Sequence, residues 1–200
     1  GMRQNKYCVA VTGGIGSGKS EVMKIIQTLG YPVFSADSVA HEIYDDKEVL
    51  EKTAQEFPDS VVGYKVDRQK LADLVFCDES KRKKLERITH PAIMRILFRE
   101  MEQAGSDVVF AEVPLLFEGG YDKDFDAVIV VMRNLQKRIR SAAERDKVSE
   151  EKIILRIKNQ FDYEKNNISG HTVIYNDGDL ASLTDQVKQV VHEIVRKTKS

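Results

Sequence analysis

Residues 11–22 read VTGGIGSGKSEV and place four glycines within six positions ahead of a lysine–serine pair. Gly13, Gly18, Lys19 and Ser20 stand at the spacing G-x-x-x-x-G-K-[ST] of a phosphate-binding loop. In such a loop, glycines let backbone N–H groups approach phosphate oxygens, and the positive end of the following helix faces the anion. An apolar run precedes the stretch and an amphipathic run follows it, which disfavours a glycine turn without a ligand. The stretch therefore predicts nucleotide binding.

The loop pattern also assigns roles to single residues. Lys19 is expected to reach the β- and γ-phosphate oxygens, and the Ser20 hydroxyl is expected to ligate Mg²⁺. Mg²⁺ together with ATP as the phosphoryl donor is therefore the expected cofactor. The residues predicted to bind ATP are Gly14, Ile15, Gly16, Ser17, Gly18, Lys19 and Ser20.

Length and charge narrow the class of protein. The chain has 200 residues, of which 42% are hydrophobic, and this suits one compact domain with a sizeable core. A formal net charge of −1 gives no case for nucleic acid or an anionic membrane as the main partner. We therefore expect small-molecule substrates, and nothing in the sequence implies a protein partner.

The sequence also bears on the compartment. No run of about 18 apolar residues predicts a transmembrane helix, and the N-terminal residues lack the layout of a signal peptide. The only cysteines are Cys8 and Cys77, without the spacing of a zinc site. We predict that both are buried free thiols in a reducing cytoplasm, where the protein is expected to act.

Five apolar runs alternate with helical patterns along the chain. The runs are nearly continuous rather than alternating with polar residues, which is typical of a parallel sheet covered on both faces. The alternation predicts an α/β fold: a three-layer P-loop sandwich with a five-stranded parallel sheet. The expected strands lie in residues 7–13, 31–37, 107–114, 125–132 and 171–178.

The helical segments suggest subdivisions of a single domain, residues 2–200. Residues 38–104 are too long for one crossover and are predicted to form a helical insertion, with breaks near 58–63 and at Pro91. A helix over 135–147 and a second, capped by Ser149 and running to about Lys165, predict a mobile lid over about 135–167. The remaining segments, 2–37, 105–134 and 168–200, form the expected core, and its last helix covers about 179–198.

Other residues indicate what happens to the nucleotide. The guanine-reading N-K-x-D and the switch D-x-x-G are absent from the sequence, which argues against a regulatory GTPase. Asp37 follows the second strand, which we expect to lie beside the loop-bearing strand. There its carboxylate could accept a proton from a substrate hydroxyl or help to organise Mg²⁺. Position alone equally allows Asp37 to cap a helix that begins at Ser38.

The expected lid is rich in arginine. Arg138, Arg140 and Arg145 are candidates to stabilise the charge of a transferring phosphoryl group once a lid excludes water. Taken singly, each arginine is better explained as part of an ordinary solvated helix face. The cluster as a whole favours phosphoryl transfer.

Six stretches together resemble one family. The chain carries VTGGIGSGKSEV, SADSVAHEIY, ITHPAI, AEVPLLFE, RDKVSEEKIILRIKNQ and VIYNDG, from Val9 to about Leu183. In their order and spacing these stretches are similar to those of dephospho-coenzyme A kinases. The phosphate loop is shared by many proteins, whereas the combination is much more specific.

The resemblance implies a kinase that uses ATP to phosphorylate the ribose 3′-hydroxyl of dephospho-CoA, the last step of coenzyme A synthesis. It also implies that the helical insertion binds CoA and that Asp37 acts as the base or orienting group for that hydroxyl. His90, Glu112 and Leu115 are assigned to the acceptor pocket on the same ground. The alternatives are another P-loop kinase that acts on a nucleoside or nucleotide, and a non-catalytic nucleotide-dependent binding protein.

The chain departs from the family pattern in two places. Ser35 stands where the family often has the first acid of D-A-D, so no role of that acid is transferred. Ser141 stands where the family often has the first arginine of R-x-x-x-R-D, with Arg138 and Arg140 nearby. Among the lid arginines only Arg145 is held by the motif.

Overall fold

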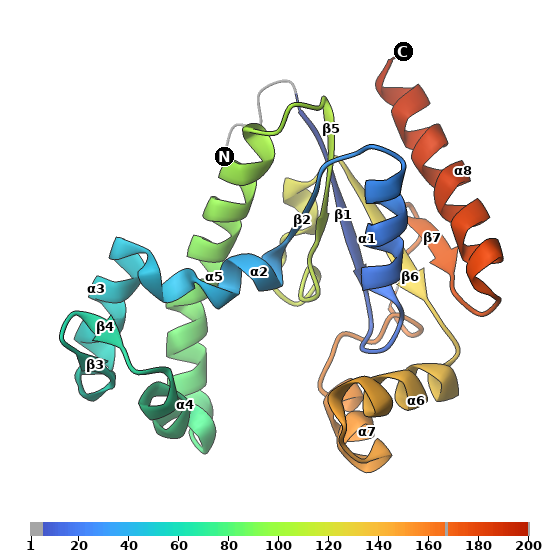
Figure 1. The fold of residues 1–200 in the computed structure, drawn as a ribbon. Helices are drawn as coiled ribbons and strands as arrows, with labels where there is room; N and C mark the ends of the chain where they lie inside the picture. Colours follow the sequence, from blue (N-terminus) through green and yellow to red (C-terminus); the bar gives the residue numbers. More distant parts are fainter. Residues whose placement is uncertain (1–5, 167, 200) are drawn as a thin grey trace. The chain divides into compact units, whose positions relative to one another are not determined.

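The computed structural model describes residues 6–166 and 168–199, which divide into two compact units (Figure 1). One unit is formed by Ser35–Glu100 and is here called the insertion unit. The other, here called the core unit, comprises the described residues before Ser35 and after Glu100. Across the described ranges, none of the helices is long and apolar enough to cross a membrane.

The core unit is built on a five-stranded parallel sheet, as predicted. Its strand order is β2-β5-β1-β6-β7, and β1 is paired with β5 on one side and β6 on the other. All five apolar runs of the sequence form strands, although each strand is no longer than the run that predicts it. The strands are β1 (Tyr7–Gly13), β2 (Val33–Ser35), β5 (Val108–Glu112), β6 (Ala127–Met132) and β7 (Thr172–Tyr175).

The expectation that the second strand lies beside the loop-bearing strand is wrong. β5 lies between β2 and β1. Residues Cys8–Gly13 of β1 are fully buried, as suits the centre of a sheet, whereas β2 has three residues that are all only partly buried. Short, half-buried strands are typical of sheet edges. Asp37 therefore follows an edge strand.

Two helices cover one face of the sheet. α1 (Lys19–Thr28) and α8 (Leu180–Thr198) run side by side in Figure 1 and share one apolar core with the strands. The helical spacing of Val22 and Ile26 places both side chains in this core, where they are fully buried. The core also contains Val9, Val11, Ile129, Val131, Ile174, Leu183, Val187 and Val191.

The remaining helices of the core unit are α6 (Leu135–Asp146), α7 (Glu150–Lys158) and the short η3 (Asp122–Asp124). Ser149 caps α7 as predicted, by accepting a hydrogen bond from the backbone N–H of Lys152. The expectation that this helix reaches Lys165 is wrong, because it ends at Lys158. Beyond it, the Phe161 ring stacks on Phe117 with ring centroids 4.8 Å apart, a contact that the helix pattern does not reveal.

The insertion unit is mostly helical. Its two-residue strands β3 (Val61–Val62) and β4 (Lys65–Val66) form a hairpin at the predicted break. The helices are α2 (Ala36–His41), η1 (Ile43–Asp45), α3 (Lys47–Glu56), η2 (Pro58–Ser60), α4 (Arg68–Phe76) and α5 (Glu79–Glu102), whose last two residues are assigned to the core unit.

The predicted break at Pro91 is wrong. α5 is 24 residues long and continues through Pro91, although proline removes a backbone donor from a helix interior. After Pro91, Met94, Leu97 and Met101 recur at a spacing of three and four residues and bury their side chains along one side of the helix. Apolar burial of this kind outweighs the lost hydrogen bond.

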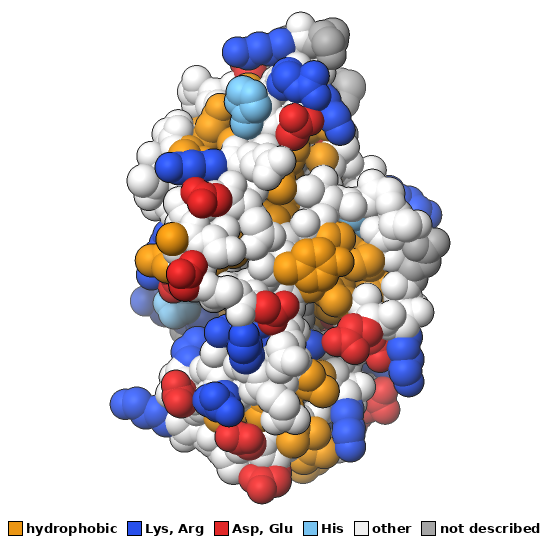
Figure 2. All heavy atoms as spheres, turned by 90° about the vertical axis from the view of Figure 1, so that its right-hand side faces the viewer, with side chains coloured by type: hydrophobic (Ala, Val, Ile, Leu, Met, Phe, Trp, Pro, Cys, Tyr) orange, Lys and Arg blue, Asp and Glu red, His pale blue; other side chains and the backbone are white. Residues whose placement is uncertain are grey.

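The two cysteines differ in exposure. No disulfide joins them; Cys8 is buried in β1, and Cys77 is exposed at the end of α4. The prediction of two buried thiols is therefore right for Cys8 and wrong for Cys77, which follows the last turn of α4 beside the exposed Phe76. On the face turned to the viewer in Figure 2, acidic and basic side chains are interspersed, in keeping with the net charge of −1.

Candidate active site

The phosphate loop joins the end of β1 to the start of α1, so the predicted order of strand, loop and helix is confirmed. Gly16 and Gly18 have φ angles of 76° and 94°, a region that side-chain-bearing residues rarely adopt. A Cβ at Gly16 would also collide with the backbone of Arg138, and one at Gly18 with the side chain of Asn176. The loop thus needs glycine at both positions. It ends at the N-terminus of α1, whose first N–H groups have no partner within the helix.

Lys19 lies against the loop. Its Nζ donates hydrogen bonds to the carbonyl oxygens of Gly13 and Gly14, at 2.9 and 3.2 Å. The ammonium group is therefore held at the loop, where a phosphate bound by the N–H groups would meet a positive charge. This position suits the role predicted for Lys19.

Ser20 and Glu112 bring two oxygen donors together beside the loop. The Ser20 hydroxyl donates to Oε1 of Glu112 over 3.4 Å, and Glu112 is the last residue of β5, paired with Val11 of β1. Among the residues that the structure describes, no group of three or more His, Cys, Asp or Glu gathers as a metal site. Mg²⁺, however, binds enzymes through one or two oxygen ligands together with substrate phosphates and water. The pair fits such an ion.

The arginines of the predicted lid differ in their surroundings. The Nε of Arg138 donates to the carbonyl oxygen of Ile15 over 3.0 Å, and its guanidinium group lies against Gly14. Burial lowers the pKa of Arg138, while the nearby groups Glu164, Tyr163 and Asp162 act in the opposite direction. Arg138 thus supports the phosphate loop directly.

Arg145 is linked electrostatically to the Ser20–Glu112 pair. It forms an ion pair with Asp146 at 2.9 Å. That hydrogen bond and the charges of Asp146 and Glu112 raise its pKa, against a smaller opposing effect of burial. The charge of the Glu112 carboxylate at the end of β5 therefore acts on Arg145. Arg140, in contrast, is exposed on α6.

Three further side chains hold the phosphate loop, and the sequence did not predict them. Arg133 donates to the Gly16 carbonyl oxygen over 3.2 Å and to the Ser141 hydroxyl over 2.7 Å. Asn176 donates to the Ser17 carbonyl oxygen over 2.9 Å, and Gln160 accepts from a loop N–H. Arg133 and Asn176 each follow the carboxyl end of a strand, where open parallel sheets bind ligands, and that position was a usable signal. Ser141, at the family's arginine position, is thus a partner of Arg133.

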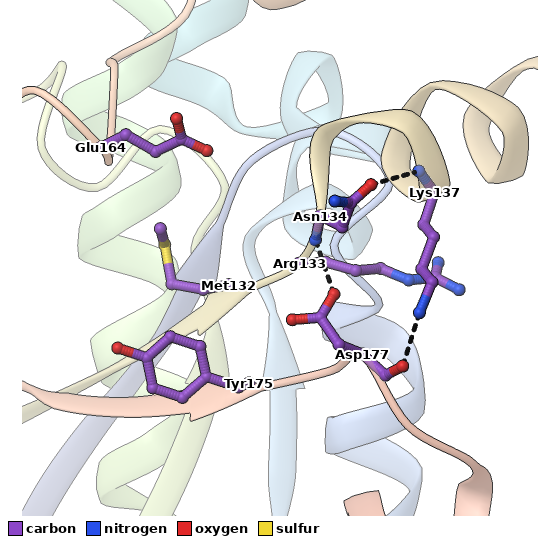
Figure 3. Close-up of a pocket in the computed structure, with 7 residues that line it drawn as sticks. All are labelled: Met132, Arg133, Asn134, Lys137, Glu164, Tyr175 and Asp177. Carbon is purple, nitrogen blue, oxygen red and sulfur yellow. Dashed lines mark hydrogen bonds between the residues drawn. The ribbon is translucent and has the colours of Figure 1, made fainter.

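A pocket lined by several polar side chains lies at the ends of β6 and β7 (Figure 3), with a volume of about 350 Å³. The carboxylate of Asp177 accepts from the backbone N–H of Asn134 over 2.7 Å, and Lys137 donates to the Asp177 carbonyl oxygen over 2.5 Å. Arg133 lines the pocket and also contacts the phosphate loop, so this residue is common to the pocket and the loop. The lining residues are Met132, Arg133, Asn134, Lys137, Glu164, Tyr175 and Asp177.

The other predicted residues lie elsewhere. Asp37 is exposed in the first turn of α2, and His90 is partly buried within α5; both belong to the insertion unit. His90 lies in the interior of α5, which begins at Glu79 and continues through Pro91. Leu115, in the core unit, is 44% exposed in the turn that follows β5.

Asp37 does not cap a helix. α2 begins at Ala36, ahead of the expected start at Ser38, and its N-cap is Ser35, whose hydroxyl accepts from the Ser38 N–H over 3.3 Å. The capping alternative for Asp37 is therefore wrong, and its carboxylate is left exposed. Serine and aspartate are both favoured N-caps, so Ser35 can serve the local structure where the family often has an acid.

We expect Ser35→Ala to lower the free energy of unfolding by about 1 kcal/mol, because it removes the cap of α2. Ser35→Asp should restore most of this loss. Urea unfolding of the three proteins, followed by circular dichroism, measures the differences. Equal stability of Ser35→Ala and the parent chain would show that the cap contributes nothing.

Known proteins resemble this chain over almost its whole length. A family model described as dephospho-CoA kinase matches residues 7–182. A curated dephospho-CoA kinase of Thermus thermophilus is 36% identical over 186 residues, covering 93% of this chain and 91% of its own. A crystal structure from Thermus thermophilus superposes with a TM-score of 0.80 at 35% identity, covering 94% of this chain and 97% of the other. A dephospho-CoA kinase from Campylobacter jejuni superposes with a TM-score of 0.70 at 28% identity, covering 96% and 98%.

Proposed function

The chain belongs to the dephospho-CoA kinase family, and from this premise we propose which of its residues carry out the family's reaction. That reaction is the ATP-dependent phosphorylation of the ribose 3′-hydroxyl of dephospho-CoA, which gives CoA and ADP in the last step of coenzyme A biosynthesis. ATP is the phosphoryl donor. The observation that carries the proposal is the phosphate loop, with Lys19, Ser20 and Glu112 gathered at it.

In this proposal residues Gly14 to Ser20 form the ATP phosphate site. The N–H groups at the start of α1 bind the phosphate oxygens, and Lys19 neutralises charge on the β- and γ-phosphates. The Ser20 hydroxyl and the Glu112 carboxylate, 3.4 Å apart, would hold Mg²⁺. The ion would neutralise phosphate charge, and the protein contributes position and a fixed electrostatic environment.

The acceptor side of the proposal rests on the family motifs. Asp37, exposed in the first turn of α2, would orient the 3′-hydroxyl and accept its proton. His90, Glu112 and Leu115 would line the acceptor pocket. We assign substrate binding to the insertion, about residues 38–104, and support comes from the separate compact unit Ser35–Glu100.

The lid side of the proposal involves α6 and α7, within about residues 135–167. Arg145 is our first candidate for the transferring phosphoryl group, because the family motif holds it and Glu112 lies within its electrostatic reach. Arg138 supports the loop directly, and Arg140 is the remaining candidate. A cytoplasmic location belongs to the same proposal, and the exposed thiol of Cys77 suits a reducing compartment.

An ADP-release assay with Mg-ATP tests the proposal. The full chain is incubated with and without dephospho-CoA and, separately, with a panel of nucleosides and nucleotides. We expect dephospho-CoA alone to stimulate ADP release strongly. Stimulation by a nucleoside instead would favour another small-molecule kinase, and ATP binding without turnover would favour a non-catalytic binding protein.

A further inference from the structure

Ile15 of the phosphate loop is also part of a second, small hydrophobic core. This core lies between α6 and α7 and contains the buried residues Ile139, Ala142 and Ile153. The partly buried side chain of Ile15 packs against it. The middle of the loop is therefore anchored in the helix pair that the sequence predicts to be a lid.

The backbone of Ile15 is held by the same region. Its N–H donates to Oε1 of Gln160 over 3.1 Å, and its carbonyl oxygen accepts from Nε of Arg138 over 3.0 Å. Gln160 lies just beyond α7, and Arg138 lies on α6. Because Gln160 accepts the Ile15 N–H, Ile15 contributes to the proposed phosphate site by fixing the shape of the loop, and not by a hydrogen bond from its own N–H to a phosphate.

Two further contacts tie the same elements together. The guanidinium group of Arg138 covers Gly14, where a Cβ would collide with it. The Tyr163 hydroxyl, three residues after Gln160, lies 3.2 Å from Oγ1 of Thr12 at the end of β1. Both oxygens are buried, and burial raises the pKa of Tyr163 to about 12, so the contact stays neutral over the ordinary pH range. The loop is thus held from α6 and from the segment after α7.

We propose that Gln160 and Arg138 are positioning residues for the ATP phosphates, which couple the shape of the phosphate loop to the α6–α7 pair through Ile15. Occupation of the loop by phosphate then stiffens this pair, and loosening the pair weakens phosphate binding. The inference rests on the proposed assignment of the ATP phosphates to the loop.

The test uses the full chain with substitutions that remove one contact each. Gln160→Leu keeps the size of the side chain but removes the acceptor, and Arg138→Met removes the donor. We expect each to raise KM for ATP roughly 3- to 10-fold, the effect of one hydrogen bond, with KM for dephospho-CoA unchanged. Arg138→Lys, which keeps a donor, should recover most of the loss. The matched control is Gln136→Ala, an exposed glutamine on α6 that should leave both constants unchanged.

Hydrogen exchange provides a second measurement, which a merely structural role of Gln160 would leave unchanged. In the parent chain, ADP should protect peptides from α6 and α7, and Gln160→Leu should reduce that protection while Tm stays within a few degrees. If ADP binds the parent chain but leaves these peptides unchanged, or if KM for ATP is the same in Gln160→Leu, the coupling is refuted. Failure of the parent chain to bind ADP at all would instead contradict the assignment of the phosphates to the loop.

Discussion

Asp37→Asn should lower kcat roughly 10²-fold or more, while the affinity for ATP remains close to that of the parent chain. Asparagine keeps the shape of the side chain but cannot accept the proton of the ribose 3′-hydroxyl. The structure removes the main competing explanation for this residue, because Ser35 and not Asp37 caps α2. Steady-state kinetics at saturating dephospho-CoA, with ATP affinity measured by calorimetry, separate the two effects.

The control for Asp37→Asn must replace an acidic residue at the same position in another helix. Asp37 lies two residues after the N-cap of α2, where a negative charge is favoured by the helix dipole. Glu151 is also exposed and lies two residues after the N-cap of α7. Glu151→Gln should therefore reproduce any loss of helix stability without the loss of turnover. Near-normal kcat in Asp37→Asn would exclude Asp37 as the base.

Lys19→Met should lower kcat/KM for ATP roughly 10²- to 10³-fold, the effect of removing one preorganised charge stabiliser. The Lys19 ammonium is held at the loop by the carbonyl oxygens of Gly13 and Gly14. Methionine fills similar space but supplies no charge to the β- and γ-phosphates. The kinetics of both substrates and the Tm of the variant test this expectation.

Lys24 provides the control for Lys19→Met, because it lies on the same helix, α1, and is exposed. Lys24→Met should leave kcat/KM within about twofold of the parent value, the usual range for a surface change. If Lys19→Met retains full activity with an unchanged Tm, then Lys19 does not stabilise the transferring group. A large fall in Tm would instead show that the lysine maintains the loop structure.

The strands of the sheet could be predicted from sequence, but their order could not. Continuous apolar runs identify buried strands because both faces of a parallel sheet are covered. Which strands are neighbours depends on tertiary packing across long separations, and β5 follows the insertion before it pairs with β1. The shortness and partial burial of β2, which are typical of an edge strand, are visible only in the structure, because the sequence predicts a longer run over 31–37.

The ends of the helices could likewise be predicted from the sequence only in part. Ser149 marked the start of α7 in the sequence, because capping is a local property. The end of α7 and the continuity of α5 through Pro91 depend instead on distant contacts, such as the stacking of Phe161 on Phe117.

The candidate site divides in a similar way. The loop residues follow from spacing alone, since the chemistry of phosphate binding lies in consecutive backbone groups. Gln160 and Asn176, which hold that loop, lie more than a hundred residues away in sequence, and only the fold brings them to it. The proximity of Ser20 and Glu112 likewise follows from the pairing of β1 with β5.

The contrast between the two cysteines offers a route to spectroscopy of the native chain. Cys8 is fully buried in β1, whereas Cys77 is exposed on the insertion unit. A maleimide dye should therefore react with Cys77 alone, without any engineered cysteine. The emission of the bound dye would report changes in the insertion unit that the acceptor induces. Titration with dephospho-CoA and with ATP would show which substrate changes the emission.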